Sequence, residues 1–323
     1  MKEEAMSDTD ADLIALFDRV NNAGRWGQDD ELGTLNHITP AKRRSAAQLV
    51  RTGEVVSLAH PISPGEAGPD GRMRLEPRYG RPPEASGVPW SAGDRLTVEV
   101  HASALTHVDC VSHIASLDQR VYNGRGFDDV AGAAGVSHGS VYAQRGGIVT
   151  RGVLLDLPAA LGLRWLEPDR PVTVADLEAA EGHAGARAGS GDVLVLRVGA
   201  EPRIADGPGG IVLSPGPDAG AIAWLHEREI AAWAGDAPDR VDARGARLLA
   251  GMGLGGEAAT SRFMFPLHQV GIPAMGLVLF DHCSVEPLSD ICARLGRYEF
   301  LFVAAPLPIR GATGSAVNPL AIF

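Results

Sequence analysis

The chain has 323 residues, of which 45% are hydrophobic and 21% charged, so it can bury a sizeable core. Its formal net charge of -11 excludes a nucleic-acid partner from our expectations, because phosphate binding needs clustered Lys and Arg. No stretch approaches the about 18 apolar residues of a membrane span, and three cysteines imply no disulfide framework. We therefore expect a soluble, cytoplasmic protein that binds no membrane.

The first 50 residues predict a helical extension. Apolar residues recur with helical spacing over 10–22, and a second helix over 38–53 would begin with Thr39 as its N-cap. Residues 63–90 are crowded with Gly and Pro and predict a long loop, either a substrate lid or an ordinary surface excursion.

Beyond that loop, strand and helix patterns alternate without a regular period, and no linker divides the chain. This order predicts one α/β domain over 1–323. Strands are expected at 54–62, 95–102, 147–157, 192–199, 210–215 and 275–281, and helices at 173–185, 217–230 and 288–296.

The stretch "THVDCVSH" places His107, Asp109 and His113 in the spacing H-x-D-x-x-x-H. On a strand, residues i and i+2 point to the same face, so His107 and Asp109 can reach one cation. Imidazole with carboxylate suits Zn, Mn or Fe rather than Ca. His113 follows a short turn and would lie behind the ligands or serve as a general base.

The stretch "SALTHVDCVSH" resembles the signature H-x-G-T-H-x-D-x-P-x-H of the cyclase-like metal hydrolases, which include bacterial kynurenine formamidases and isatin hydrolases. The resemblance extends from Trp26 to the end, through "VYNGR", "GIVTRGVLLDL", "PGPDAGAIAWL" and "GRYEFLFVAAPLPIRGATGSAVNPLA". It implies a swivelling β/β/α fold with a mixed central sheet, in a homodimer or larger assembly. It also implies metal-dependent hydrolysis of a small amide or lactam, often a cyclic or N-formyl aryl amide.

Carried over to this sequence, the resemblance makes His107 and Asp109 metal ligands. His113 matches a histidine that binds a second metal or acts as the base. Ser103 stands where the signature has its first histidine. His101 lies six residues before His107, about 20 Å along an extended strand, so we expect it to be a bystander.

A later family block, "FPLHQVGIPAMGLVLFD", offers His268 or Gln269 as a further ligand, then Asp281 in place of the family's Glu. The simplest expectation is one cation, Mn or Zn with Mg as a further option. His107, Asp109 and either His268 or Gln269 would hold it. Asp281 and Ser103 would then either mark a second metal position or contact the ligands from behind.

In this interpretation a metal-activated water attacks the amide, and His113 accepts its proton. Trp26, His60 and Trp90 are candidate walls of the substrate pocket, although an exposed strand end also explains His60. Turn formation explains Asp236 and Asp239, with a substrate contact as the alternative. Cys110 is expected to be a buried structural thiol rather than a nucleophile.

The sequence is also compatible with other functions. The same scaffold would serve a lactone hydrolase, a cyclase or a dehydratase. The pattern H-x-D with a distant His also matches the facial triad of a non-haem iron oxygenase. A non-catalytic member that only binds a ligand is a third alternative, because Ser103 and Asp281 depart from the signature.

Overall fold

The computed structural model describes residues 9–63, 73–80, 91–101, 105–168, 170–206, 214–237, 239–241 and 262–323. Ser103, Trp90 and most of the strand predicted at 210–215 lie outside these ranges. Within them, no helix is both long enough and apolar enough to cross a membrane.

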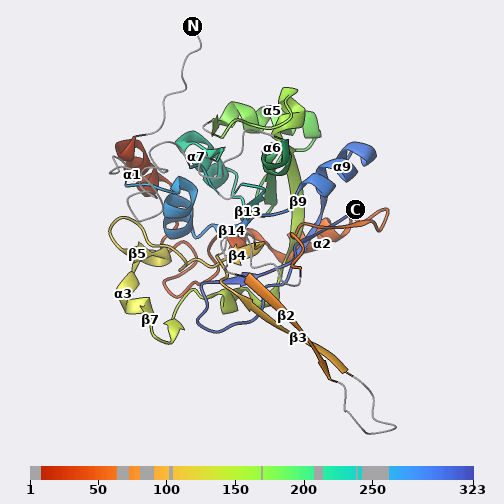
Figure 1. Ribbon diagram of the computed structural model, residues 1–323. Coiled ribbons are helices and arrows are strands. Elements are labelled where there is room, and N and C mark those ends of the chain that lie inside the picture. The colour runs from red at the N-terminus through yellow and green to blue at the C-terminus, as the bar shows by residue number, and fades with distance from the viewer. Residues whose placement is uncertain are drawn as a thin grey trace.

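A nine-stranded mixed sheet organises the described part of the chain, in the order β1-β17-β15-β9-β11-β13-β14-β4-β16 (Figure 1). The inner strands β9, β11, β13 and β14 are parallel, whereas β15 and β4 join them antiparallel on either side. The mixed α/β class is thus confirmed. The strands are β1 Val55–Ser57, β4 His107–Asp109, β9 Ile148–Asp156, β11 Val193–Arg197, β13 Ala232–Gly235, β14 Val278–Asp281, β15 Glu299–Ala304, β16 Gly314–Ala316 and β17 Leu320–Ile322.

Side chains of the inner strands alternate between two apolar cores, one on each face of the sheet. Leu155 and Leu279 enter the core that also holds α5 and α7, while Leu154 and Phe280 enter the core beneath α9. Burial on both faces is typical of parallel strands covered by helices. The helices are α1 Asp10–Arg19, α2 Pro40–Ala47, α3 Phe127–Val130, α4 Leu157–Leu161, α5 Val174–Ala184, α6 Ala200–Asp206, α7 Ala219–Glu227 and α9 Glu286–Leu295, with the short helices η1 Gly33–His37, η2 Tyr122–Gly124 and η3 Val141–Gly146 and the π-helix η5 Leu267–Met275.

The predicted helices are confirmed, and their ends follow local sequence signals. Thr9 and Thr173 each accept a bond from the backbone three residues on, where an aspartate returns the bond and completes a capping box. Thr39 caps α2 as expected, but this helix ends at Ala47, earlier than the sequence predicted.

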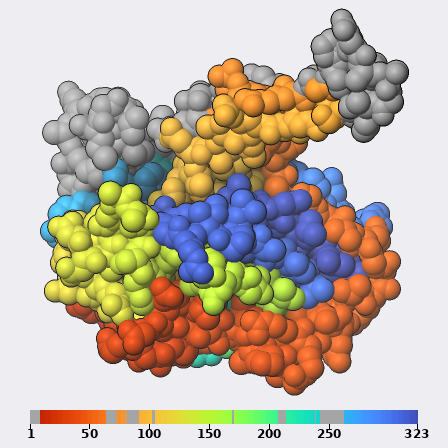
Figure 2. All heavy atoms as spheres, turned by 90° about the horizontal axis from the view of Figure 1, so that it is seen from below, coloured from red at the N-terminus to blue at the C-terminus, as the bar shows by residue number. Residues whose placement is uncertain are grey.

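The prediction of a loop throughout 63–90 is wrong over Met73–Gly80. This segment is strand β2, which pairs antiparallel with β3, Ser91–Val98, in a hairpin that projects from the body (Figures 1 and 2). Because β3 ends at Val98, the strand predicted at 95–102 stops before His101. The remaining strands form two-stranded pairs: β5 Arg120–Val121 with β6 Arg125–Gly126, β7 Ala131–Gly132 with β8 Gly135–Val136, and β10 Pro171–Val172 with β12 Gly216–Pro217.

Candidate metal centre

Two neighbouring strands bring three of the expected site residues together. Asp281, the last residue of β14, pairs directly with His107 of β4, so their side chains share a face of the sheet. Asp109 lies two residues further along β4 and points the same way. Nε2 of His107 lies 3.6 Å from Oδ1 of Asp109 and 4.0 Å from Oδ2 of Asp281. All three side chains are buried.

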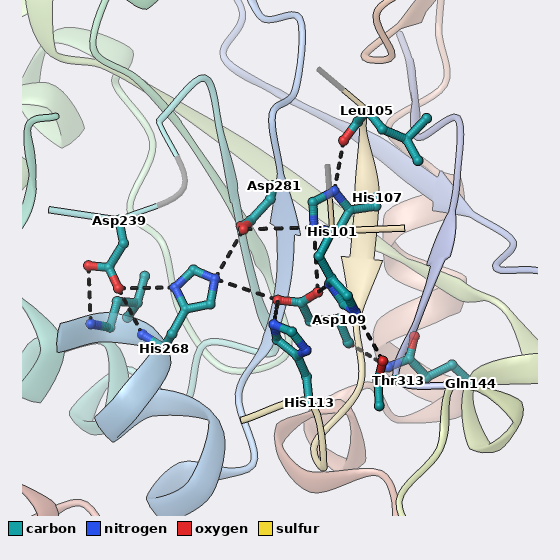
Figure 3. Close-up of polar contacts among 11 residues, drawn as sticks. His101, Leu105, His107, Asp109, His113, Gln144, Asp239, His268, Asp281 and Thr313 are labelled. Carbon is teal, nitrogen blue, oxygen red and sulfur yellow. Dashed lines mark hydrogen bonds and ion pairs between the residues drawn. The ribbon is translucent and has the colours of Figure 1, made fainter. Parts of the chain in front are cut away.

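His268 completes this face from the π-helix η5. Its Nε2 lies 3.0 Å from Oδ2 of Asp281 and 3.5 Å from Oδ2 of Asp109 (Figure 3). Single-turn π-helical segments often occur at functional sites. Of the two residues that the sequence left open, His268 is the one whose ring faces the two carboxylates.

The side chain of Gln269, the other candidate ligand, forms its hydrogen bonds with the turn before η5. Its side-chain oxygen accepts the backbone N–H groups of Met264 and Phe265, at 2.7 and 3.0 Å. Its Nε2 donates to the carbonyl of Arg262. The amide is thus used to close the turn that precedes η5.

Asp239, which the sequence left as a turn former or a substrate contact, lies directly behind His268. Its carboxylate accepts the backbone N–H groups of Leu267 and His268, and Oδ2 lies 3.0 Å from Nδ1 of His268. The signal that would have found it is its place just beyond β13. Residues at the carboxyl ends of parallel strands meet at one edge of the sheet.

His113 and His101 approach Asp109 from its other side. Nε2 of His113 lies 3.9 Å from Oδ2 of Asp109, and the His113 ring stacks on the His101 ring with centroids 3.7 Å apart. Nδ1 of His101 lies 3.0 Å from Oδ1 of Asp109. The expectation that His101 is a bystander is wrong, because the chain leaves β3 at Val98 and turns, rather than continuing as an extended strand.

The hydrogen bonds of His107 decide which nitrogen faces the carboxylates. Nδ1 lies 2.7 Å from the carbonyl of Leu105, which can only accept, so Nδ1 carries the hydrogen. In the neutral ring, Nε2 then presents its lone pair to Asp109 and Asp281. Metal-binding histidines are commonly oriented by such a contact at the remote nitrogen.

The carboxylates leave buried oxygen atoms without hydrogen bonds. Among the described residues, neither oxygen of Asp109 nor Oδ1 of Asp281 has a partner with hydrogen-bond geometry. Leaving such oxygens unpaired is costly in a protein interior unless a cation lies against them. Buried oxygens facing imidazole nitrogens are the donor set of a divalent-metal site.

The same contacts shift the pKa values of the cluster. Burial would raise the pKa of Asp109, but electrostatic interaction with His113 and the contacts of His101 and His268 hold it well below its ordinary value. Burial would lower the pKa of His268, but the charge of Asp281 and its contacts with Asp109 and Asp239 raise it well above its ordinary value. Asp109 is therefore ionised and able to bind a cation.

Two further groups are kept neutral by burial. Burial lowers the pKa of His113 to about 4, against the opposing charge of Asp109, so its imidazole is uncharged at neutral pH. Burial raises the pKa of the Cys110 thiol to about 12. The thiol is buried and un-ionised, which confirms the expectation of a structural cysteine.

Of the three expected pocket residues, Trp26 lies away from the His/Asp cluster. Its ring packs on His37, and Arg25 lies over it and bonds to Glu229. Glu229 precedes β13 at the amino end of the strand, whereas the cluster lies beyond the carboxyl ends of the parallel strands. Trp26 thus belongs to the opposite edge of the sheet, and Trp90 is outside the described residues.

His60 lines a cavity of about 540 Å³ that adjoins β4 and β16. Leu105 and Thr106, the two residues before His107, form part of its wall, as does Ala316, which pairs with His107. Nε2 of His60 lies 3.9 Å from Oε1 of Glu201. The remaining lining residues are Ser57, Ala59, Pro61, Ile62, Ala305, Leu307, Val317 and Asn318.

Solved structures show the same fold. A novel cyclase is 26% identical, with a TM-score of 0.77 over 95% of this chain and 99% of that chain. Isatin hydrolase A from Ralstonia solanacearum is 22% identical, with a TM-score of 0.53 over 87% of this chain and 95% of its own. An isatin hydrolase bound to the product analogue thioisatinate is 21% identical, with a TM-score of 0.54 over 88% and 95%. These likenesses confirm the expected cyclase-like fold.

A search of curated proteins finds no match to this sequence. A family model described as "Putative cyclase" matches residues 56–242, which include strand β4 and the motif from His107 to His113. Since that match spans more than half of the 323 residues, the chain belongs to the cyclase family.

Proposed function

We propose that this chain is a metal-dependent hydrolase that cleaves the carbon–nitrogen bond of a small cyclic or N-formyl aryl amide. The observation that carries the proposal is the pair of buried Asp109 oxygens, which lack hydrogen bonds among the described residues and are surrounded by four imidazoles. His107, Asp109, His268 and Asp281 are the residues that would hold the cation. Mn or Zn suits this mixture of nitrogen and oxygen donors, with Mg as a further option.

A divalent cation supplies a Lewis acid there and lowers the pKa of bound water from 15.7 to about 7. The Leu105 carbonyl and the Asp239 carboxylate orient the imidazoles of His107 and His268 through their Nδ1 atoms. These two contacts fix the direction of the Nε2 lone pairs before substrate arrives.

His113 is the proton acceptor in this mechanism. Its imidazole is neutral, and Nε2 faces the cluster. It would take the proton of the attacking water and pass it to the leaving nitrogen. The C–N bond breaks as a C–O bond forms, which leaves a carboxylate and an amine.

We place the substrate in the cavity beside β4. Its walls are mostly apolar, as a planar ring requires, and His60 supplies a polar contact. One relative with this fold was solved with thioisatinate, a product analogue that supports a small ring compound as the class of substrate. We therefore propose that His60 is part of the substrate pocket.

A homodimer in the cytoplasm completes the proposal. The β2–β3 hairpin carries apolar residues on one face, where Leu75 pairs with Leu96, and Leu96 is 49% exposed. A two-stranded hairpin is marginally stable on its own in water, so we propose that a second copy of the chain packs against it.

The three free, buried cysteines support a reducing compartment. Light scattering and cell fractionation test these two points.

The decisive experiment is a hydrolysis screen of aryl amides, lactams and lactones with metal-free protein, to which Mn²⁺, Zn²⁺ or Mg²⁺ is restored separately. We expect amide or lactam turnover that depends on the metal. Faster lactone turnover would instead indicate the related lactone hydrolase. Oxygen uptake with ferrous iron would point to an oxygenase, and failure to bind any of these metals would contradict the enzyme proposal.

A further inference from the structure

The cavity beside β4 holds a histidine–carboxylate pair that the metal cluster does not use. Nε2 of His60 lies 3.9 Å from Oε1 of Glu201, which α6 carries. His60 lines the cavity, whereas Glu201 does not, so the carboxylate lies behind the imidazole. The side chains of His60 and Glu201 are 34% and 36% exposed, which leaves the ring accessible to a molecule in the cavity.

Neighbouring segments hold Glu201 in place. Ser284 donates its hydroxyl hydrogen to Oε1 of Glu201 at 3.0 Å. Asp236 accepts the three backbone N–H groups of residues 198–200, each at 2.8 Å. These bonds fix the start of α6 directly before Glu201, so the carboxylate is held in place before a substrate enters the cavity.

Thr106 connects the pair to the metal cluster. Its Oγ1 accepts the backbone N–H of His60 at 3.0 Å and donates to the carbonyl of His282 at 2.6 Å. Thr106 directly precedes His107, whose ring centroid lies 6.1 Å from that of His282. These links place His60 on the cavity side of the cluster, where the rest of a bound substrate lies in the proposed mechanism.

The carboxylate of Glu201 decides which nitrogen of His60 carries a free lone pair. A carboxylate only accepts hydrogen bonds, so a neutral His60 keeps its hydrogen on Nε2, toward Glu201. Nδ1 is then an acceptor, and no described residue donates to it. The hydroxyl hydrogens of Ser57 and Thr106, which also line the cavity, are already donated elsewhere. Nδ1 is thus open to an N–H group that a substrate supplies.

We propose that His60, held by Glu201, accepts a hydrogen bond from the N–H of the scissile amide. His60 thus contacts the substrate, and Glu201 is a positioning residue that acts through it. The enzyme accordingly prefers lactams and secondary amides to lactones and N-alkylated amides, which carry no such hydrogen. This inference rests on the proposed function and on the placement of the substrate in the cavity beside β4.

The experiment compares the amide or lactam that the hydrolysis screen finds to be turned over fastest with its N-methyl derivative, for example formanilide with N-methylformanilide. We expect wild type to prefer the N–H compound by about 10-fold or more in kcat/KM, as the loss of one hydrogen bond predicts.

Glu201→Gln is the first variant. Its side-chain amide can donate to Nε2 of His60, which moves the ring hydrogen to Nδ1 and makes that atom a donor. The preference for the N–H compound should then fall to within about twofold, with bound metal unchanged by mass spectrometry. Glu227→Gln is the matched control, because Glu227 is an exposed glutamate on α7, and it should retain the preference.

A double-mutant cycle tests whether Glu201 acts through His60. His60→Phe keeps a flat ring but removes the acceptor, so it should also abolish the preference, and adding Glu201→Gln should change kcat/KM no further. Equal turnover of both compounds by wild type, an unchanged preference in Glu201→Gln, or additive losses in the double variant would each overturn the inference and leave the proposed function standing. A wild type that hydrolyses no amide or lactam would overturn both.

Discussion

Oδ2 of Asp239 lies 3.0 Å from Nδ1 of His268 and also accepts the backbone N–H of the same residue, at 2.9 Å. One carboxylate thereby fixes both the start of η5 and the rotation of the imidazole that η5 carries. Because Asp239 is fully buried, this arrangement is shielded from competing water. The position of His268 in the cluster therefore depends on a residue that does not itself face Asp109.

Replacing Asp239 by Asn tests this dependence. The amide has one oxygen and cannot accept the four donors that the carboxylate accepts, namely Nδ1 of His268 and the backbone N–H groups of Leu267, His268 and Arg240. We expect metal affinity to fall by about 10- to 100-fold, as for other outer contacts of metal ligands. Calorimetric titration with Zn²⁺ measures the change.

The control for this variant is Asp236→Asn. Asp236 is buried three residues earlier and accepts the backbone N–H groups of Val198, Gly199 and Ala200, at the start of α6. Its replacement should lower the free energy of unfolding but leave metal affinity within about twofold. An equal loss of affinity in both variants would contradict a specific role for Asp239.

His268 and Gln269 are neighbours with opposite predicted effects. His268→Ala removes a nitrogen that faces both carboxylates and should lose bound metal. Gln269→Ala removes bonds to the turn before η5 and should cost about 1 kcal/mol of stability per lost bond while metal content is kept. Metal analysis of the purified variants decides between these outcomes, and loss of metal in Gln269→Ala alone would reverse the assignment.

His113→Ala is expected to separate turnover from metal binding. If His113 accepts the proton, turnover of a metal-dependent substrate should fall by about 10²- to 10⁴-fold. Metal content should stay at the wild-type value, because Nε2 of His113 is the most distant of the four imidazole nitrogens from Asp109, at 3.9 Å. Parallel loss of metal and turnover would make His113 a ligand instead.

His282 should make the metal-free protein sensitive to acid. Burial lowers the pKa of His282 to about 4, so between its unfolded value of 6.5 and about 4 the unfolded state binds the extra proton. Stability that is present above pH 6.5 is then lost as the pH falls, by up to about 1.4 kcal/mol per pH unit for this one group.

The variant that tests this effect is His282→Asn. His282 has a φ of 53°, a left-handed conformation that Asn tolerates well, so the replacement removes the titration without adding backbone strain. We expect denaturant unfolding between pH 6.5 and 4 to show a shallower loss of stability than in wild type. Identical slopes would show that His282 takes no part.

Local features of the fold follow from the sequence because their causes lie within a few residues. Thr9 and Thr173 begin helices whose third residues are aspartates, and these capping boxes form as the spacing predicts. The alternation that places Leu154 and Leu155 on opposite faces of β9 is likewise written in consecutive residues. Secondary structure in residues 63–90 is harder to predict from the sequence, because the many Pro and Gly residues there favour a loop, whereas Met73–Gly80 forms a strand.

The sequence by itself determined the pair His107 and Asp109, since a strand places residues i and i+2 on one face whatever surrounds it. Only the tertiary structure decided between His268 and Gln269, added Asp239, and turned His101 toward Asp109. Each of these placements depends on the path of the chain between elements: after β13, before η5 and after β3. Such directions are set by packing between distant segments, which no local spacing encodes.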